Sequence, residues 1–505
     1  MHLSIKMKLL LAGMVVVVAL TTVTILFYTL LLDSVEPITP RPVTYKEARL
    51  KQSEQYQVVV GTAIGSQFYT LKVYNCSSSN ASSIMVQWNN IHWQKVEDRQ
   101  IYLYHSFYDA RYIDFQARYH YVRIIGMTQG KIQKEESYFC SMWYMEFQDP
   151  VVVKADTSEV WMQHWNRNPD PDTYHTYLFT CPVPLSMRDS HLYPDFVSVS
   201  SQPCGDITTK LPIQKKGFAE WQNGGGKKFA VCVKGMDFDE DISIKLIEWL
   251  ELLFILGADQ VFIYKYTIHK NVGKVFDYYE KKGKVKVISL TLPGDQPNEP
   301  KLRTTYLKRA LWQKRRNELV PYNDCLYRNI YLFKYVIPLD IDEVIIPVKS
   351  YTWPEMFLEF QKKNSKVMKK FASFSAPNAY FFEAFNSTHN PSVPKYFHMP
   401  HHTIRSANFS IFGHSVKSFV STRNSRTVFN HYTLETLYSN MKTYKVMNTS
   451  IVQMNHYKKR CPREIYSQCK SNFLVFSKND NIIDKYIKEL VYRVESVLEE
   501  IQLSV

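Results

Sequence analysis

The sequence lacks a second long apolar segment, and the one that it has carries no charge. Residues 9–32 (LLLAGMVVVVALTTVTILFYTLLL) contain no Asp, Glu, Lys or Arg. A helix of about 20 apolar residues is long enough to cross a bilayer. No other uncharged apolar run in the 505 residues approaches this length. This absence excludes a multi-pass topology and predicts a single N-terminal transmembrane helix.

The charges around this segment predict its orientation. Lys6 and Lys8 precede it, whereas Asp33 and Glu36 follow it. The positive-inside rule therefore places a short tail in the cytoplasm and the rest of the chain in the lumen. A cleaved signal peptide is the alternative, but its apolar region would span only about 7–15 residues. We expect an uncleaved signal anchor.

Cysteine is absent from the first 75 residues, and all eight cysteines follow the predicted anchor. Disulfides persist on that side of the membrane. Cys461 and Cys469 are close enough in sequence to pair, whereas Cys232, inside an apolar strand pattern, is a candidate for a free core cysteine. The N-x-S/T glycosylation sequons lie on the same side, at Asn75, Asn80, Asn386, Asn408 and Asn448.

Acidic residues are fewer than basic ones. There are 47 Asp and Glu against 62 Lys and Arg, which gives a formal charge of +15. In a nuclear protein this excess would suggest nucleic acid, but behind a membrane anchor we expect no nucleic-acid partner. A basic solvated surface is the simpler interpretation, and attraction of an anionic substrate such as a nucleotide diphosphate is the sharper one.

The pattern of apolar and polar residues divides the chain into two main parts. Between residues 56 and 212, short alternating segments such as QVVVGT, YTLKVY and HYVRIIGM predict strands separated by polar turns. This β-rich part shows no catalytic constellation. The three glycines at 224–226 then predict a linker.

Strands alternate with helices after residue 228. FAVCVKG, QVFIYKY and KVKVISL are typical of strands, and residues 243–256 and 272–282 have helical length, ending at Gly257 and Gly283. Such alternation predicts βαβ units, and therefore an α/β domain with a Rossmann-like, mostly parallel sheet.

A basic segment follows these units. We expect residues 303–319 to form one helix, and Asn323 or Asp324 to cap the next. Its cations are candidates for holding a diphosphate, although most of such a helix face is solvated. We expect one or two members of the cluster to face a site; the cluster comprises Lys308, Arg309, Lys314, Arg315 and Arg316.

Three acids interrupt the apolar segment KYVIPLDIDEVIIP, residues 334–347. Unpaired charge is costly in such surroundings. Residues i and i+2 of a strand share a face, so Asp340 and Asp342 can point the same way at the end of a strand. Two carboxylates suit Mn²⁺ or Mg²⁺. The pair therefore predicts a metal site, with a solvated turn as the alternative and Glu343 unassigned.

Four segments in order resemble glycosyltransferase family 92 over residues 228–469: KFAVCVKGMDFDEDISIKLIEWLELLFILGADQVFIY, LTLPGDQPN, RRNELVPYNDCLYRN and KYVIPLDIDEVIIP. The resemblance implies a GT-A-like catalytic domain in a type II Golgi membrane protein. It implies β-galactosyl transfer from UDP-galactose, with Mn²⁺, onto fucose of N-glycan cores. Pro338 and the KKR after Tyr457 depart from the family's pattern, so donor or acceptor preference is open.

The resemblance also implies roles for particular residues. Asp340 and Asp342 would hold the metal, and His431 and His456 are candidates for a third ligand or a phosphate contact. Of these two, we expect His456 at the metal. The residues expected at the donor are Lys234, Asp324, Arg328, Asp340 and His431.

The expected organisation combines these observations. In chain order it comprises a cytoplasmic tail (1–8), a transmembrane signal anchor (9–32), a stem (33–55), a β-rich lumenal domain (56–212), a linker (213–227), a GT-A-like glycosyltransferase domain (228–475) and a C-terminal helix (476–505).

The general base is sought among few acids. An inverting transfer is a single displacement and needs a base for the acceptor hydroxyl. Residues 384–434 contain no Asp or Glu. Glu383, which follows a predicted strand, is our candidate for the base, with a structural salt bridge as the alternative role.

Two other functions compete with glycosyl transfer. A haloacid-dehalogenase-like phosphatase has a D-x-D-x-T/V signature, which Asp340, Asp342 and Val344 match. In that fold the signature lies on the first strand, whereas more than a hundred residues of α/β pattern precede it here. The other alternative is a membrane-tethered glycan-binding protein with an inactive transferase domain.

Overall fold

The computed structural model describes most of the chain after residue 57. The described ranges are 58–61, 68–76, 81–97, 99–114, 117–162, 164–166, 168–222, 226–385, 393–411, 413–461 and 465–503. The predicted tail, anchor and stem lie outside them, as do the sequons at Asn80 and Asn386. Asn75, Asn408 and Asn448 are described and exposed. Among the described helices, none is both long and apolar enough to span a membrane.

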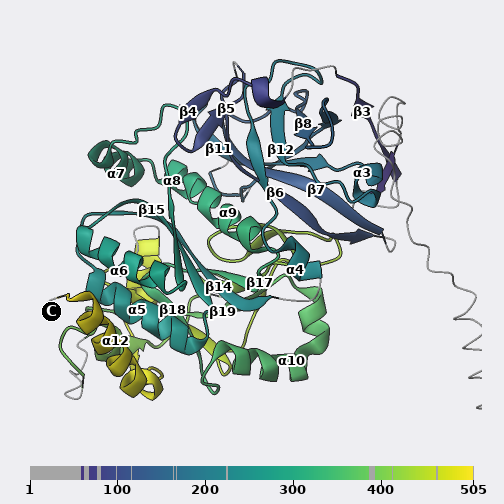
Figure 1. Ribbon diagram of the computed structural model, residues 1–505. Coiled ribbons are helices and arrows are strands. Elements are labelled where there is room, and N and C mark those ends of the chain that lie inside the picture. The colour runs from purple at the N-terminus through teal and green to yellow at the C-terminus, as the bar shows by residue number, and fades with distance from the viewer. Residues whose placement is uncertain are drawn as a thin grey trace, which may run out of the picture. The chain divides into compact units, whose positions relative to one another are not determined.

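A mixed sheet forms the centre of the α/β region (Figure 1). Four of its strands are parallel neighbours in the order β16-β15-β14-β17. The antiparallel β22 follows β17, and β19 and β25 complete the order. The bounds are β14 Lys227–Phe238, β15 Gln260–Ile268, β16 Val285–Ser289, β17 Phe333–Pro338, β19 Ser373–Ala376, β22 Lys417–Ser421 and β25 Lys445–Val446.

The side chains of β14 alternate between two cores. Phe229, Val231 and Val233 pack with the helices on one face, whereas Ala230 and Cys232 pack on the other face. Because successive side chains of a strand point to opposite faces, an unbroken apolar run is what a strand covered on both sides requires. The sequence pattern FAVCVKG therefore reflects a buried parallel strand.

Helices cover the first of these faces. Figure 1 shows α5, α6 and α12 together beside the central sheet. Their bounds are Ser243–Leu256, Lys270–Lys281 and Ile487–Ile501. The structure confirms the end of α5 at Gly257, which has a φ of 105°. A left-handed residue at this position favours glycine.

The predicted basic helix over 303–319 is wrong, because the chain forms three helices here: α7 Pro300–Arg309, α8 Leu311–Asn317 and α9 Leu319–Asn329. Ala310 has a ψ of 70° and interrupts the helix. Gln313 of α8 bonds the backbone of Tyr174 in the β-rich region, so tertiary contacts set the direction of α8. Asn323 and Asp324 lie inside α9 rather than at its cap.

The β-rich region contains a second sheet with the order β10-β11-β7-β6-β13-β12-β8-β9-β3. The strands of this path are β3 Val73–Tyr74, β6 Ile101–Asp114, β7 Ala117–Gln129, β8 Phe139–Trp143, β9 Val151–Lys154, β10 Asp156–Glu159, β11 Tyr174–Pro182, β12 Phe196–Ser200 and β13 Leu211–Gln214. The sheet also includes β5 Trp93–Lys95, which pairs with β6, and β4 Trp88–Asn90, which pairs with β5. The expected linker, residues 213–227, contains the end of β13, α4 Phe218–Gln222 and the start of β14. Helix α9 packs between the two regions, and one hydrophobic core runs across them.

A small sheet of order β18-β26-β20 lies beyond the end of β17. Its strands are β18 Glu343–Pro347, β26 Val452–Lys458 and β20 Asn378–Phe382. This sheet brings together segments that are far apart in the sequence. The remaining helices and strands are β1 Val58–Gly61, β2 Phe68–Leu71, α3 Leu185–Asp189, α10 Trp353–Lys370, β21 Ile404–Ser406, β23 Ser425–Val428, β24 Thr433–Thr436, α11 Tyr466–Asn472 and β27 Ser477–Asn479.

Every cysteine of the chain lies in a disulfide. The pairing of Cys461 with Cys469 is confirmed. Cys232 is not free, because it pairs with Cys325 of α9, with 6.2 Å between their Cα atoms. The face of β14 that carries Cys232 is the face on which α9 packs, and sequence distance hides this proximity. The other pairs are Cys76–Cys204 and Cys140–Cys181.

Candidate metal and catalytic site

The acids of the segment KYVIPLDIDEVIIP lie in a turn. Strand β17 ends at Pro338, and the backbone N–H of Glu343 donates to Asp340 O at 3.0 Å. The Asp340 N–H in turn donates to Glu343 Oε2 at 2.9 Å. Because the chain is no longer extended here, the expectation that Asp340 and Asp342 share a strand face does not hold.

Asp340 is held by lysines. Its carboxylate is 3.3 Å from Lys234 Nζ and 3.6 Å from Lys417 Nζ. Lys234 also contacts Glu318 at 3.3 Å. Burial opposes ionisation of Asp340, but Lys234 and Lys417 outweigh it and keep the pKa of Asp340 well below its ordinary value. Burial likewise disfavours the Lys234 cation, yet Asp340 and Glu318 raise the pKa of Lys234.

Asp342, Glu343 and His456 form a group that can hold a metal ion. One potential ligand atom from each lies within 4.8 Å of the others. His456 Nε2 is 3.5 Å from Glu343 Oε1 and 3.7 Å from Asp342 Oδ2, both longer than a good hydrogen bond. Both ring nitrogens of His456 are buried without a hydrogen-bond partner among the described residues. Two carboxylates and an imidazole are a donor set suited to Mn²⁺.

Cations neutralise these acids. Lys458 Nζ is 2.7 Å from Asp342 Oδ2, and Lys417 Nζ is 3.0 Å from Glu343 Oε2. Burial opposes ionisation of Asp342, but the neighbouring His456 and Lys458 lower its pKa below the ordinary value. Asp342 is therefore an anion, ready to act as a ligand, over the whole neutral range.

A cavity of about 710 Å³ opens beside this group. Of the residues expected at the donor, the structure brings Lys234, Asp340 and His431 into its lining, together with Glu343 and His456. Burial, and then Lys417, lower the pKa of His431 to about 3. Its imidazole is therefore neutral, with Nδ1 at 2.8 Å from the Val416 carbonyl oxygen.

Asp324 and Arg328 lie elsewhere. Asp324 is fully buried and accepts from Tyr264 at 2.5 Å and Arg328 at 2.5 Å. His105 of β6 is 2.7 Å away from it. These contacts join α9 to β15 and to the β-rich region. The structure therefore gives Asp324 and Arg328 a place in the packing between regions and outside the lining of the larger cavity.

The members of the basic cluster, residues 308–316, lie in different environments. Lys314 and Arg315 line the large cavity. Arg316 is buried and pairs with Glu159 of the β-rich region at 2.8 Å. Two members of the cluster thus face this cavity, and whether they contact a diphosphate stays a prediction.

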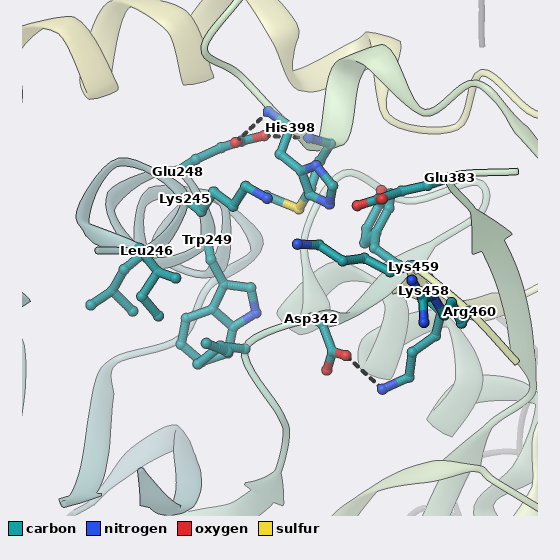
Figure 2. A pocket seen from close by; sticks show the side chains of 14 residues that line it. Lys245, Leu246, Glu248, Trp249, Asp342, Glu383, His398, Lys458, Lys459 and Arg460 are labelled. Atoms are coloured by element: carbon teal, nitrogen blue, oxygen red, sulfur yellow. Dashed lines mark hydrogen bonds and ion pairs between the residues drawn. The ribbon is translucent and has the colours of Figure 1, made fainter. Parts of the chain in front are cut away.

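A second cavity of about 370 Å³ is lined by Asp342 (Figure 2). Asp342 and Glu383 both line it, with Lys458 and His398. Glu383 follows β20 and is exposed, and its backbone N–H donates to Lys458 O at 3.0 Å. No salt bridge of Glu383 occurs among the residues that the structure describes, so its carboxylate is available to the cavity.

A buried acid holds the wall of this second cavity. Glu248 of α5 accepts hydrogen bonds from the backbone N–H groups of His398 and Met399, at 2.8 and 2.7 Å. Burial raises the pKa of Glu248 to about 7, although these two bonds favour the anion. Figure 2 shows Glu248 pointing from its helix to the His398 segment.

Sequence reasoning left several of these residues without a role. Glu343 was visible in the acidic motif but unassigned, and the structure makes it a member of the group with Asp342 and His456. Lys458 lies in the KKR segment that departs from the family's pattern. Lys417 is in a strand that carries no motif, so nothing in the sequence distinguished it.

Comparisons with known structures give only weak similarity. The crystal structure of S. aureus TarS 1-349 is 14% identical, with a TM-score of 0.22, and the match covers 46% of this chain and 60% of that one. Ferredoxin-NADP+ reductase from Plasmodium falciparum is 9% identical, with a TM-score of 0.12, covering 46% and 85%. The match thus spans less than two thirds of the TarS chain. Comparison with curated proteins gives no significant match.

The family comparison is decisive. The sequence profile described as glycosyltransferase family 92 matches residues 227–497. The matched part contains the central sheet, the acidic turn, Glu383 and His456. Because it extends over more than half of the 505 residues, the chain belongs to glycosyltransferase family 92, and its class of activity is glycosyl transfer.

Proposed function

We propose that this protein is a metal-dependent inverting transferase that moves β-galactose from UDP-galactose to a glycan acceptor such as the core fucose of an N-glycan. Family membership supports the donor and acceptor. The observation that carries the metal dependence is the group formed by Asp342, Glu343 and His456, whose potential ligand atoms lie within 4.8 Å of one another. The sheet order β16-β15-β14-β17 with the antiparallel β22 supports a GT-A-like domain.

The two cavities suit two substrates. The larger one contains Lys234 and Arg315, which can bind a diphosphate. The smaller one contains Asp342 and Glu383, and Lys458 lines both cavities. We assign the donor to the larger cavity and the acceptor to the smaller. Mn²⁺ held by Asp342, Glu343 and His456 would offset the charge of the diphosphate leaving group.

Glu383 is the proposed base. A carboxylate in the acceptor cavity can take the proton of the attacking hydroxyl as the new bond to the anomeric carbon forms. The bond from that carbon to the diphosphate oxygen breaks in the same step, so the sugar changes configuration and UDP leaves. Lys234, which contacts Asp340 at 3.3 Å, is placed to stabilise the departing charge.

We also propose that the protein is a single-pass type II protein of the Golgi membrane. The charge pattern around residues 9–32 supports this orientation. The disulfides on the far side of this segment suit an oxidising lumen.

The proposed activity is tested in a transfer assay with the full-length protein. UDP-galactose and other UDP-sugars are offered with fucosylated and unfucosylated glycans, in Mn²⁺ or in chelator. We expect transfer only with Mn²⁺, and its loss in Asp342→Asn. The matched control is Asp189→Asn, because Asp189 lies in α3 with a side chain that is 61% exposed. Full turnover by a normally folded Asp342→Asn protein would contradict the proposal. No turnover by the unmodified protein with any donor would favour the glycan-binding alternative.

A further inference from the structure

The wall of the larger cavity extends beyond the part of the chain that the family profile matches. Met162, His164 and Trp165 line the cavity that contains Asp340 and His456. These three residues belong to the β-rich region, whereas the profile begins at residue 227. The site that we assign to the donor is therefore built by two regions of the chain.

Trp165 and Trp312 form an aromatic platform in this wall. Their ring centroids are 6.2 Å apart, and Trp165 also packs edge-on against Phe429 at 5.7 Å. Trp312 keeps 43% of its surface exposed. A tryptophan fully used in packing would be buried, so a large aromatic face here is free to contact a ligand.

The platform is held in place. Trp161 Nε1 donates to Trp165 O at 2.8 Å, and the guanidinium of Arg316 lies 3.9 Å from the centre of the Trp161 ring. Arg316 also pairs with Glu159. These contacts tie Trp165 to helix α8, which carries Trp312. A pre-positioned aromatic surface loses little freedom when a ligand binds.

The order of groups along the cavity matches the order of groups in a nucleotide. Lys417 contacts Glu343 of the metal-capable group at 3.0 Å and Asp340 at 3.6 Å. From Asp340, contacts run to Lys234 and from Lys234 to Glu318. Glu318 then contacts Arg315 at 3.2 Å. Trp312 lies one helical turn before Arg315 on the same helix. A metal site, two cations and an aromatic surface thus follow one another.

We propose that the Trp165–Trp312 platform binds the nucleobase of the nucleotide-sugar donor, and that the β-rich region is therefore part of the donor site. This inference rests on the proposed function, because it takes the larger cavity as the donor site. Stacking on tryptophan suits any flat π-face, and the cations between platform and metal group suit the diphosphate. A sugar ring of the acceptor stacking on the same surface is the competing outcome.

Two ligands distinguish binding of the nucleobase from binding of the diphosphate. UDP and inorganic diphosphate are titrated calorimetrically into the full-length protein with Mn²⁺. We expect Trp312→Ala to weaken UDP binding about tenfold to a hundredfold, the usual effect of losing one base stack, and to leave diphosphate binding unchanged. Trp165→Ala should act in the same way. Trp88→Ala is the control, because Trp88 of β4 is 56% exposed in the β-rich region. This variant should bind both ligands normally.

Any other binding result for Trp312→Ala overturns the inference. Trp165 also packs internally, so a folding defect in Trp165→Ala leaves the decision to the exposed Trp312. Unchanged UDP affinity in Trp312→Ala would refute the platform, as would equal weakening of UDP and diphosphate. A raised KM for the acceptor with normal UDP binding would assign the platform to the acceptor. If the unmodified protein binds neither ligand, the proposed function itself fails and the inference fails with it.

Discussion

His456 lies directly opposite Glu343 in the antiparallel pairing of β26 with β18, and its Nε2 is 3.5 Å from Glu343 Oε1. Residues opposed in such a ladder have Cβ atoms only about 5 Å apart. The ladder therefore fixes an acid and an imidazole that are distant in the sequence. Asp342 precedes the strand by one residue and completes the group.

Replacing His456 should weaken metal binding. We expect His456→Asn to lower Mn²⁺ affinity by at least about tenfold, as loss of a group in or beside a metal's coordination sphere commonly does. The matched control is His191→Asn, since His191 is exposed and its φ of 56° is one that Asn tolerates. Calorimetric titration of Mn²⁺ measures both. Equal affinities would remove His456 from the metal site.

Replacing Glu383 should separate binding from chemistry. We expect Glu383→Gln to bind UDP and Mn²⁺ normally while transfer falls about 10²-fold or more, which is the usual contribution of a general base. Glu359→Gln, at an exposed position of α10, should retain transfer. The measurement is initial rate alongside nucleotide affinity. Undiminished transfer in Glu383→Gln would exclude it as the base.

The stability of the protein should depend on pH through Glu248. Its pKa is raised from 4.5 to about 7 in the folded state, so the folded protein binds the extra proton in this range. The contribution of this proton to the free energy of unfolding is therefore fully present below pH 4.5 and is lost as the pH rises to about 7. We expect the free energy of unfolding to fall by about 3 kcal/mol over this range, since each unit of pKa shift is worth about 1.4 kcal/mol.

The comparison that isolates this effect is Glu248→Gln. The variant cannot ionise at this position, so its melting temperature should fall less than that of the unmodified protein between pH 4.5 and 7. Subtracting the two plots of melting temperature against pH removes the opposing titration of His398. Burial, and then His402, lower the pKa of His398 to about 3. Parallel curves would show that Glu248 does not titrate in this range.

The disulfides should differ in their contribution to stability. Cys232 and Cys325 are separated by 93 positions, whereas Cys461 and Cys469 are separated by 8. The chain-entropy model gives about 4–5 kcal/mol for the long loop and about 2–3 kcal/mol for the short one. Replacing both cysteines of the long pair by Ala should lower the denaturant midpoint more than the same change in the short pair. The reverse ranking would contradict this entropic account.

Local patterns predicted much of the α/β region. The helix over 243–256, its end at Gly257 and the neighbouring strands follow from residues close in sequence. Steric freedom at glycine and the burial of alternating side chains act over a few residues, so the sequence displays them directly. The pairing of Cys461 with Cys469 was visible for the same reason. The motifs also identified the family and gave Asp342 and His456 as candidates.

Long-range packing decided the rest. The interruption at Ala310 and the place of Asp324 depend on how the β-rich region packs against α8 and α9. The partner of Cys232 depends on how α9 packs against β14. The role of Glu343 depends on the register between β18 and β26, which no local pattern encodes. Trp165 joins the cavity only because two regions share one core. The sequence by itself determined most of the local elements and the chemistry of the motif residues. The tertiary structure decided which side chains meet, since contacts between distant segments are set by the packing of whole faces.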